Sequence, residues 1–298
     1  KTMTTTTFPN SATRELLQEW VDIPQIEARV GAALVDLGDT STSWMHFLLA
    51  YAFWNGRVAN GVSSLAAFIG EQKNLFKDPH LPNVVADRSN YIASFVFDAA
   101  REEYDDQMEH HRDTRRCLGQ ATIMGAAQYF GIDLASMQEP QWLHAFHNSV
   151  RAGYLGLSPL AIDAARENPL PAELLHRIFQ GMGYHLGNEL LADREFSILD
   201  TFLRTQQPAL VSHLLGFTTA FAGGKHRGYA WIGLHNSTSG EAPPSDQHFQ
   251  HALQGVNEAL ALIPAHLTDE CMLALRHGFM RFASDHEHFF HRAGQVLE

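Results

Sequence analysis

Two acidic side chains and a histidine interrupt an apolar stripe that runs at helical spacing through residues 90–124. Glu103 and His110 are seven residues apart, about two helical turns, so their side chains point to the same side of a helix. Because the stripe begins and ends with apolar residues, we expect it to face the core. An unpaired buried carboxylate is costly, and a metal ion or a charged partner would remove that cost. The alternative is that residues 101–113 form a solvated face.

A second acidic position interrupts the apolar pattern further along the chain. Glu189 lies on a stripe that is otherwise apolar and includes Phe196, with His185 at its edge. Glu195 lies on the neighbouring stripe and is the runner-up for an inward-facing carboxylate. The alternative for Glu189 is a position at the edge of a helix, paired with an arginine. Periodicity therefore favours one buried carboxylate in this segment.

Histidines and an aspartate flank a Ser-, Gly- and Pro-rich loop at residues 236–244. His235 ends an apolar helix, and Asp246 suits the beginning of the next helix. His248 begins a stripe that points inward, whereas His251 begins one that points outward. Any one of these histidines, taken alone, fits an ordinary core or surface position.

Taken together, these residues indicate a metal site rather than isolated buried polar groups. Carboxylates and neutral imidazoles on the inward faces of at least three helices are the ligand set of a non-haem iron centre. The only cysteines, Cys117 and Cys271, exclude a disulfide framework and a thiolate zinc site. A ferritin-like site needs Glu-x-x-His on two helices, and we find only Glu173-x-x-His176, at a helix start. A ferritin-like dimetal site is therefore disfavoured.

The elements that would position these residues are helices almost throughout, because apolar residues recur every three or four positions. We find no linker or internal repeat, so we predict a flexible segment at 1–10 and one all-α domain at 11–298. Lys1-Thr2, before Met3, resembles a cloning remnant. A first helix is expected from Ser11. Further helices are expected at residues 25–37, 43–57, 60–76, 88–130, 140–152, 158–166, 171–205, 207–222, 226–236, 246–262 and 268–296.

Composition narrows the function classes. The 33 Asp and Glu outnumber the 21 Lys and Arg, for a net charge of −12, and no basic tract offsets this balance. Nucleic acid and anionic membranes are therefore poor partners. No apolar run reaches the ~18 residues of a membrane span, and the N-terminus has no apolar signal core. We expect a cytoplasmic protein, and a homodimer because homodimers are common.

The residues above resemble the haem-oxygenase-like diiron oxidases and oxygenases. Glu103-x6-His110 resembles the Glu and His on that family's core helix, and the segment around Glu189 is similar to its middle Glu segment. His235 with Asp246 and His248 resembles the family's His-x-x-x-Asp-x-x-His motif with a departure. About ten residues separate His235 from Asp246 where the family has three, and Asp246 precedes His248 by two. The resemblance covers roughly residues 45–292.

The resemblance implies a single haem-oxygenase-like helical bundle that binds two Fe(II)/Fe(III) ions and uses O2 as co-substrate. The implied metal ligands are Glu103, His110, Glu189, His235, Asp246 and His248. All of these except Asp246 are also the implied catalytic residues, and Glu102, Glu195, Glu241 or His251 remain open as substitutes. The implied activity is oxidation of a small aliphatic amino-acid-like substrate by desaturation, C–N cyclisation or N-oxygenation in natural-product biosynthesis, with a possible external electron donor.

Several residues are expected around such a site. Asp106 and His185 would orient ligands, Arg112, Arg194 or Arg227 would bind a substrate carboxylate, and Phe95, Trp231 and Phe249 would exclude water. Two other functions remain open. A metal-free helical enzyme would use the same residues as acids and bases on an organic cofactor or substrate, and a helical binding protein would use them as hydrogen-bonded core pairs.

Overall fold

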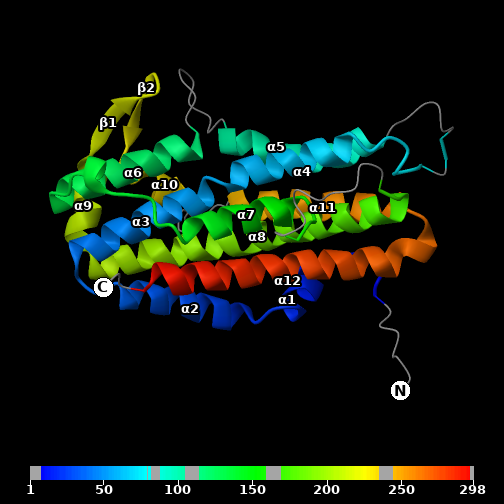
Figure 1. The fold of residues 1–298 in the computed structure, drawn as a ribbon, viewed down its shortest axis with the longest axis horizontal. Coiled ribbons are helices and arrows are strands. Elements are labelled where there is room, and N and C mark those ends of the chain that lie inside the picture. Colours follow the sequence, from blue (N-terminus) through cyan, green and yellow to red (C-terminus); the bar gives the residue numbers. More distant parts are fainter. Residues whose placement is uncertain are drawn as a thin grey trace.

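The computed structural model describes residues 8–78, 80–81, 88–104, 114–158, 169–234 and 244–295. The chain is 75% helical, which confirms the all-α prediction. The two longest helices, α8 (Pro171–Gln206) and α12 (Thr268–Ala293), run side by side along the long axis of the molecule (Figure 1). In the part of the chain described, no helix has both the length and the apolar character needed to cross a membrane.

The other helices surround this pair. α1 (Arg14–Glu19) and α2 (Ile23–Asp36) lie along α12, whereas α4 (Val58–Gly70) packs on α5 (Ser89–Tyr104) on the opposite side (Figure 1). The remaining helices are α3 (Ser41–Asn55), α6 (Arg115–Phe130), α7 (Leu143–Tyr154), α9 (Pro208–Gly216), α10 (Ala230–Leu234) and α11 (Pro244–Ala261). Short 3-10 helices, η1 (Leu134–Ser136) and η3 (Ala265–Leu267), connect them.

The structure corrects three of the predicted helices. The prediction of one helix over 88–130 is wrong, because Thr114 is extended (φ −75°, ψ 152°) and its side chain caps α6 by accepting from the Cys117 N–H. Helices were also predicted over 207–222 and 226–236. Instead, α9 ends at Gly216, and β1 (Thr218–Phe221) pairs antiparallel with β2 (Gly224–Arg227) before α10 begins. The predicted helix at 158–166 lies almost entirely outside the described residues.

One apolar core runs through the helices, from Ala12 to Ala293. Its centre is aromatic: Trp54 of α3 stacks on Phe289 of α12 with ring centroids 4.8 Å apart, and Tyr51 lies 5.2 Å from Trp231 of α10. Large buried rings contribute strongly to core stability because each removes much apolar surface from water. The core therefore holds α3, α10 and α12 in place around α8.

Two glycines allow α8 and α12 to pack backbone against backbone. A Cβ added at Gly183 would overlap the Leu275 carbonyl, and one added at Gly278 would overlap the Gln180 carbonyl. The backbone cannot give way as the end of a flexible side chain can, so a methyl group here has to separate the two helices. Small residues at this crossing thus set the position of the α8 segment that begins at residue 183.

We expect Gly183→Ala to lower the free energy of unfolding by about 1–3 kcal/mol, because the added methyl group overpacks the α8–α12 contact. Gly31→Ala in α2 is the matched control, since nothing lies within 4 Å of its added Cβ. That variant should be up to about 1 kcal/mol more stable, from helix propensity alone. Urea unfolding measures both, and equal effects of the two substitutions would contradict the assigned close packing.

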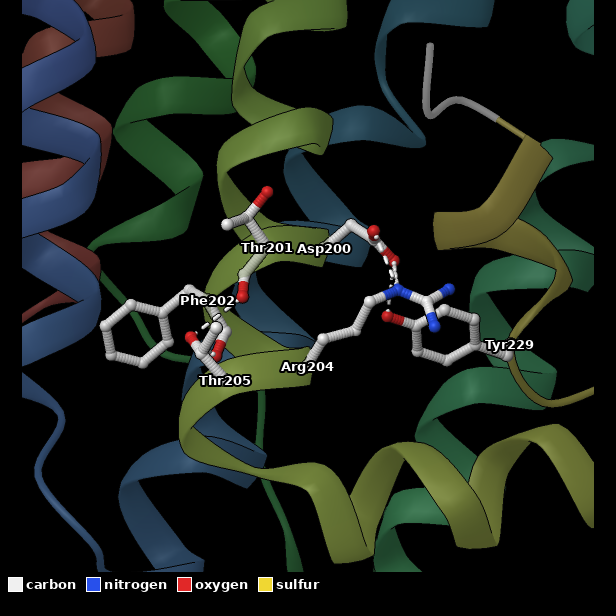
Figure 2. Close-up of polar contacts among 6 residues, drawn as sticks. All are labelled: Asp200, Thr201, Phe202, Arg204, Thr205 and Tyr229. Atoms are coloured by element: carbon white, nitrogen blue, oxygen red, sulfur yellow. Dashed lines mark hydrogen bonds and ion pairs between the residues drawn. The ribbon is translucent and has the colours of Figure 1, made fainter. Parts of the chain in front are cut away.

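A polar cluster joins the end of α8 to the segment that precedes α10 (Figure 2). The Tyr229 hydroxyl donates to Asp200 Oδ1 at 2.6 Å, and Arg204 Nε donates to the same carboxylate at 2.9 and 3.0 Å. Burial, followed by the hydrogen bond to Asp200, raises the pKa of Tyr229, so the phenol keeps its proton. The cluster anchors the residues just before Trp231.

A second polar cluster ties α7 to α8 and α12. Ser149 and Tyr184 both donate to Asp285 Oδ2, at 2.7 and 2.9 Å. Burial raises the pKa of Asp285 above its ordinary value of 3.8, although the bonds from Ser149 and Tyr184 and the charge of Arg281 act against that shift. Ionisation of this carboxyl group is therefore less favourable in the folded protein than in the unfolded chain.

The raised pKa of Asp285 predicts how the contribution of this residue to the free energy of unfolding changes with pH. As pH rises above 3.8, the unfolded chain loses the Asp285 proton before the folded protein does, so this group destabilises the fold increasingly until its folded pKa is passed. The unfolding free energy of the parent minus that of Asp285→Asn should therefore be larger at about pH 3 than at about pH 7. Urea unfolding at both pH values measures the difference, and an opposite slope would refute the shift.

Candidate metal centre on helix α8

The carboxylate of Glu189 lies between two imidazole rings. Its Oε1 atom is 3.6 Å from His185 Nδ1 on the preceding turn of α8, and its Oε2 atom is 3.9 Å from His248 Nδ1 on α11. Glu189 and His248 are each 11% exposed, and His185 is 1% exposed. Each oxygen of one carboxylate thus faces a different ring.

These groups approach one another without forming hydrogen bonds. Both distances exceed 3.5 Å, and neither ring nitrogen of His185 has a hydrogen-bond partner although both are buried. Burial lowers the pKa of His185, Glu189 raises it and His248 lowers it, with a net downward shift. His185 is therefore a neutral imidazole. Its unprotonated ring nitrogen has a lone pair that can bind a metal ion.

Tyr154, the last residue of α7, is influenced electrostatically by both Glu189 and Glu103. Its side chain is fully buried, and its hydroxyl has no hydrogen-bond partner. Burial raises the pKa of Tyr154 well above 10, and the charges of Glu189 and then Glu103 raise it further, whereas Arg115 lowers it. Both carboxylates thus act electrostatically on one buried hydroxyl, so Glu103 of α5 and Glu189 of α8 both influence Tyr154 without a hydrogen bond to it.

Glu103 lies near the end of α5 and is 6% exposed, as the apolar stripe predicts. Its Oε1 atom forms an ion pair with Arg115, the first residue of α6. Ile92 and Val96, earlier on the same stripe, are also buried. The sequence pattern therefore predicted the direction of this side chain, but it did not predict the arginine.

Three of the six predicted metal ligands, Glu103, Glu189 and His248, have described side chains. Glu189 and His248 lie together, and the charges of Glu189 and Glu103 both raise the pKa of Tyr154. His251 is exposed, as predicted, and Glu173 caps α8 by accepting the Leu170 N–H at 3.1 Å. Outside the described residues or side chains lie His110, His235, Asp246, Glu102, Asp106, Arg112 and Glu241.

Glu195 has a different environment from Glu189, although both belong to α8. Its Oε1 atom accepts from the Tyr51 hydroxyl at 2.8 Å, and its Oε2 atom lies 2.6 Å from His286 Nε2. All three side chains are at least 97% buried, since their exposed fractions are 3%, 1% and 1%. Both oxygens of Glu195 are satisfied within the core, which favours Glu189 over Glu195 as the ligand.

A cavity of about 260 Å³ opens beside Arg115. Arg116, Asn55 and Gln120 supply further polar groups at its wall. The apolar part of the wall consists of Leu49, Ala52, Phe53, Gly56, Gly119, Ile123 and Trp231. Trp231 lines this cavity, and its predicted role in excluding water from the metal site stays a prediction. Two arginines over an apolar wall suit a small organic anion.

Of the arginines predicted to bind a substrate carboxylate, Arg194 and Arg227 do not line this cavity, and Arg112 lies outside the described residues. Arg194 forms an ion pair with Glu27 of α2, and Arg227 is an exposed residue of β2. Arg115 and Arg116 lie beside the cavity instead. Their positions follow from the break at Thr114, which the sequence pattern did not reveal.

The donor atoms around Glu189 fit a transition-metal ion of intermediate hardness. Imidazole nitrogens and carboxylate oxygens suit iron, and neither cysteine is a neighbour among the contacts described. The unpartnered nitrogens of His185 and the unpartnered Tyr154 hydroxyl are polar atoms that a bound ion or its water ligands would satisfy. The class that the fold and site define is an all-α protein with a buried carboxylate–imidazole cluster.

Comparison with known proteins adds no family to this description. Neither the family models, nor the curated proteins, nor the solved structures include a match to this chain. Function therefore has to be inferred from the residues of the site.

Proposed function

We propose that the protein is an O2-dependent non-haem diiron oxidase or oxygenase. The observation that supports this proposal most directly is the buried Glu189 carboxylate between His185 and His248, at distances too long for hydrogen bonds. Only a long hydrogen bond from Asn188 Nδ2, at 3.4 Å, reaches this carboxylate, so the arrangement is costly unless a further group binds there. The proposed ligands are Glu103, Glu189 and His248, together with His110, His235 and Asp246 from the family resemblance.

Two bound Fe(II) ions would supply electrons for the activation of O2, which is the oxidant of the reaction. The protein's own residues have three roles around them. Arg115 balances the charge of Glu103, His185 stands one turn from Glu189 as an orienting ring, and Tyr154 keeps its phenolic proton under the influence of both carboxylates. The buried ring of Tyr154 lies 6.1 Å from the His185 ring, between centroids, and helps to exclude water there, which protects a reactive site from side reactions.

The proposed substrate is a small aliphatic amino-acid-like molecule. The cavity of about 260 Å³ has room for a molecule of that size, and Arg116 offers a guanidinium group for a carboxylate. Arg115 lines the cavity and also contacts Glu103, so the cavity adjoins the proposed site. We further propose a cytoplasmic homodimer that receives electrons from an external donor, with a role in natural-product biosynthesis.

A metal-free enzyme or binding protein is the second candidate. The ion pair between Arg115 and Glu103 favours it, because a carboxylate with a cationic partner does not need a metal ion. In that case the cavity would bind an organic anion, and Glu189 with Tyr154 would act as acid and base.

Anaerobic titration with Fe(II) separates the two candidates. We expect the parent protein to bind two iron ions at the α8 site and to show a transient visible absorption band when O2 is added. Glu71→Ala, which removes an exposed carboxylate at the end of α4, is the control and should behave as the parent does. Iron binding that is unchanged by removal of the Glu189 carboxylate would overturn the proposal.

A further inference from the structure

A second group of potential metal ligands lies at the other end of α7. Glu139 precedes the helix, and His144 and His147 are one turn apart on it. One ligand atom from each residue lies within 4.8 Å of the other two. The two rings are 6.0 Å apart at an angle of 87°, so their edges converge without stacking.

The buried atoms of this group lack hydrogen bonds. Glu139 Oε1 and His147 Nε2 are both buried without a hydrogen-bond partner, and His147 is 9% exposed. Glu139 Oε1 lies 3.5 Å from His147 Nδ1, too far for a good hydrogen bond between them. Buried polar groups in folded proteins are nearly always paired, so two such atoms in one place indicate a missing partner.

This group is separate from the α8 site. His144 and Tyr154 are ten residues apart on one helix, which corresponds to about 15 Å along its axis. None of Glu139, His144 and His147 belongs to the ligand set implied by the family resemblance. The two groups can therefore be tested independently.

We propose that Glu139, His144 and His147 form a binding site for one divalent transition-metal ion of the Zn²⁺ type. Two imidazoles and one carboxylate are a common ligand set for such ions, and a three-residue set leaves a coordination position for water. His144 is exposed, so the ion has a path from solvent. The site would join the loop that contains Glu139 to the first turns of α7.

The charges around the site limit its affinity and link it to the cavity. Arg57 and Arg116 lie near enough to His147 to act on it electrostatically, and their positive charges oppose a cation. We therefore expect weaker binding than in closed four-ligand zinc sites. Phe53, which lines the cavity, packs against His147 with ring centroids 6.4 Å apart. An ion bound here would thus add positive potential next to the cavity that Arg116 lines.

The test uses chelator-treated full-length protein that carries Glu189→Ala, so that the α8 site does not contribute. Titration with Zn²⁺ by calorimetry should show one bound ion, and Co²⁺ should give visible d–d absorption bands. His144→Ala in this background should weaken binding at least about tenfold. The matched control is His266→Ala, which removes another exposed histidine and should leave binding unchanged.

Because His144 is exposed, its replacement should not unfold the protein. Glu139→Gln provides a second variant, which keeps the shape of the side chain, removes its charge and should also weaken binding. Absence of a bound ion in the Glu189→Ala protein would overturn this proposal, as would equal affinity of the His144→Ala and His266→Ala variants. Neither result bears on iron binding at α8, which is measured with intact Glu189.

Discussion

The Glu189→Ala protein is expected to bind no iron at the α8 site while folding at least as stably as the parent. Glu189 is a largely buried carboxylate whose nearest imidazole nitrogens are 3.6 and 3.9 Å away, and Asn188 Nδ2 donates to its Oε1 atom only at 3.4 Å, so its charge is weakly compensated by hydrogen bonds. Removing such a group removes its desolvation penalty and leaves no strong bond broken. Residues that serve a function at the expense of stability behave in this way.

Two measurements on this variant check the expectation. Anaerobic Fe(II) titration should show the loss of two bound ions relative to the parent, and urea unfolding should show an equal or higher free energy of unfolding. If Glu189→Ala lowers the free energy of unfolding of the metal-free protein by several kcal/mol, Glu189 is a structural residue. In that case its stability role, rather than iron, would explain its burial.

The Glu195→Ala protein should show the opposite behaviour. The substitution leaves the Tyr51 hydroxyl and His286 Nε2 without their partner in the core, where they now bond to Glu195 at 2.8 and 2.6 Å. Removal of one partner from a buried ion pair typically destabilises a protein by about 3–5 kcal/mol. We expect a loss of that size in urea unfolding of the metal-free protein.

Glu195→Gln is the companion variant. Its amide oxygen can still accept the Tyr51 hydroxyl, so it should lose less stability than Glu195→Ala. The folded fraction of this variant should bind as much iron as the parent, because Glu195 has no assigned role as a ligand. Iron loss in folded Glu195→Gln would place the ligand at residue 195 and contradict the assignment of Glu189.

The direction of the buried carboxylates could be predicted from the sequence, but their partners could not. Helical periodicity indicates which side of a helix faces the core, and this is why Glu103 and Glu189 were expected to point inward. Periodicity contains no information on which distant residue meets them. Tyr51 and Glu195, for example, are 144 residues apart, and Arg115 reaches Glu103 only because the chain breaks between their helices.

The break at Thr114 was missed because its signal is local and short. The apolar stripe continues at helical spacing on both sides of Thr114, so periodicity favoured one helix over 88–130. A threonine side chain can instead accept a backbone N–H three residues later and begin a new helix, which is what Thr114 does. The cap competes with helix continuation, and tertiary packing decides between them.

The hairpin was missed for a related reason. Each of its strands has only four residues, too few to display an alternating pattern. Gly223 has a positive φ of 83° in the turn, and the sequence marked this position as a break but did not indicate strands on either side. By contrast, the helix predicted at 171–205 is confirmed almost to the residue, because its pattern is long and ends at prolines.

α8 holds the glycine contact at Gly183, the proposed ligand Glu189, the core carboxylate Glu195 and the anchoring Asp200 on one continuous helix. A single helix fixes the spacing of these groups, so a change that suits one of them shifts the others. Substitutions in α3 and α6, whose residues line the cavity, can therefore alter the cavity without shifting the groups on α8. The size and charge of the cavity can thus change while α8 keeps the relative positions of its glycine contact and its three carboxylates.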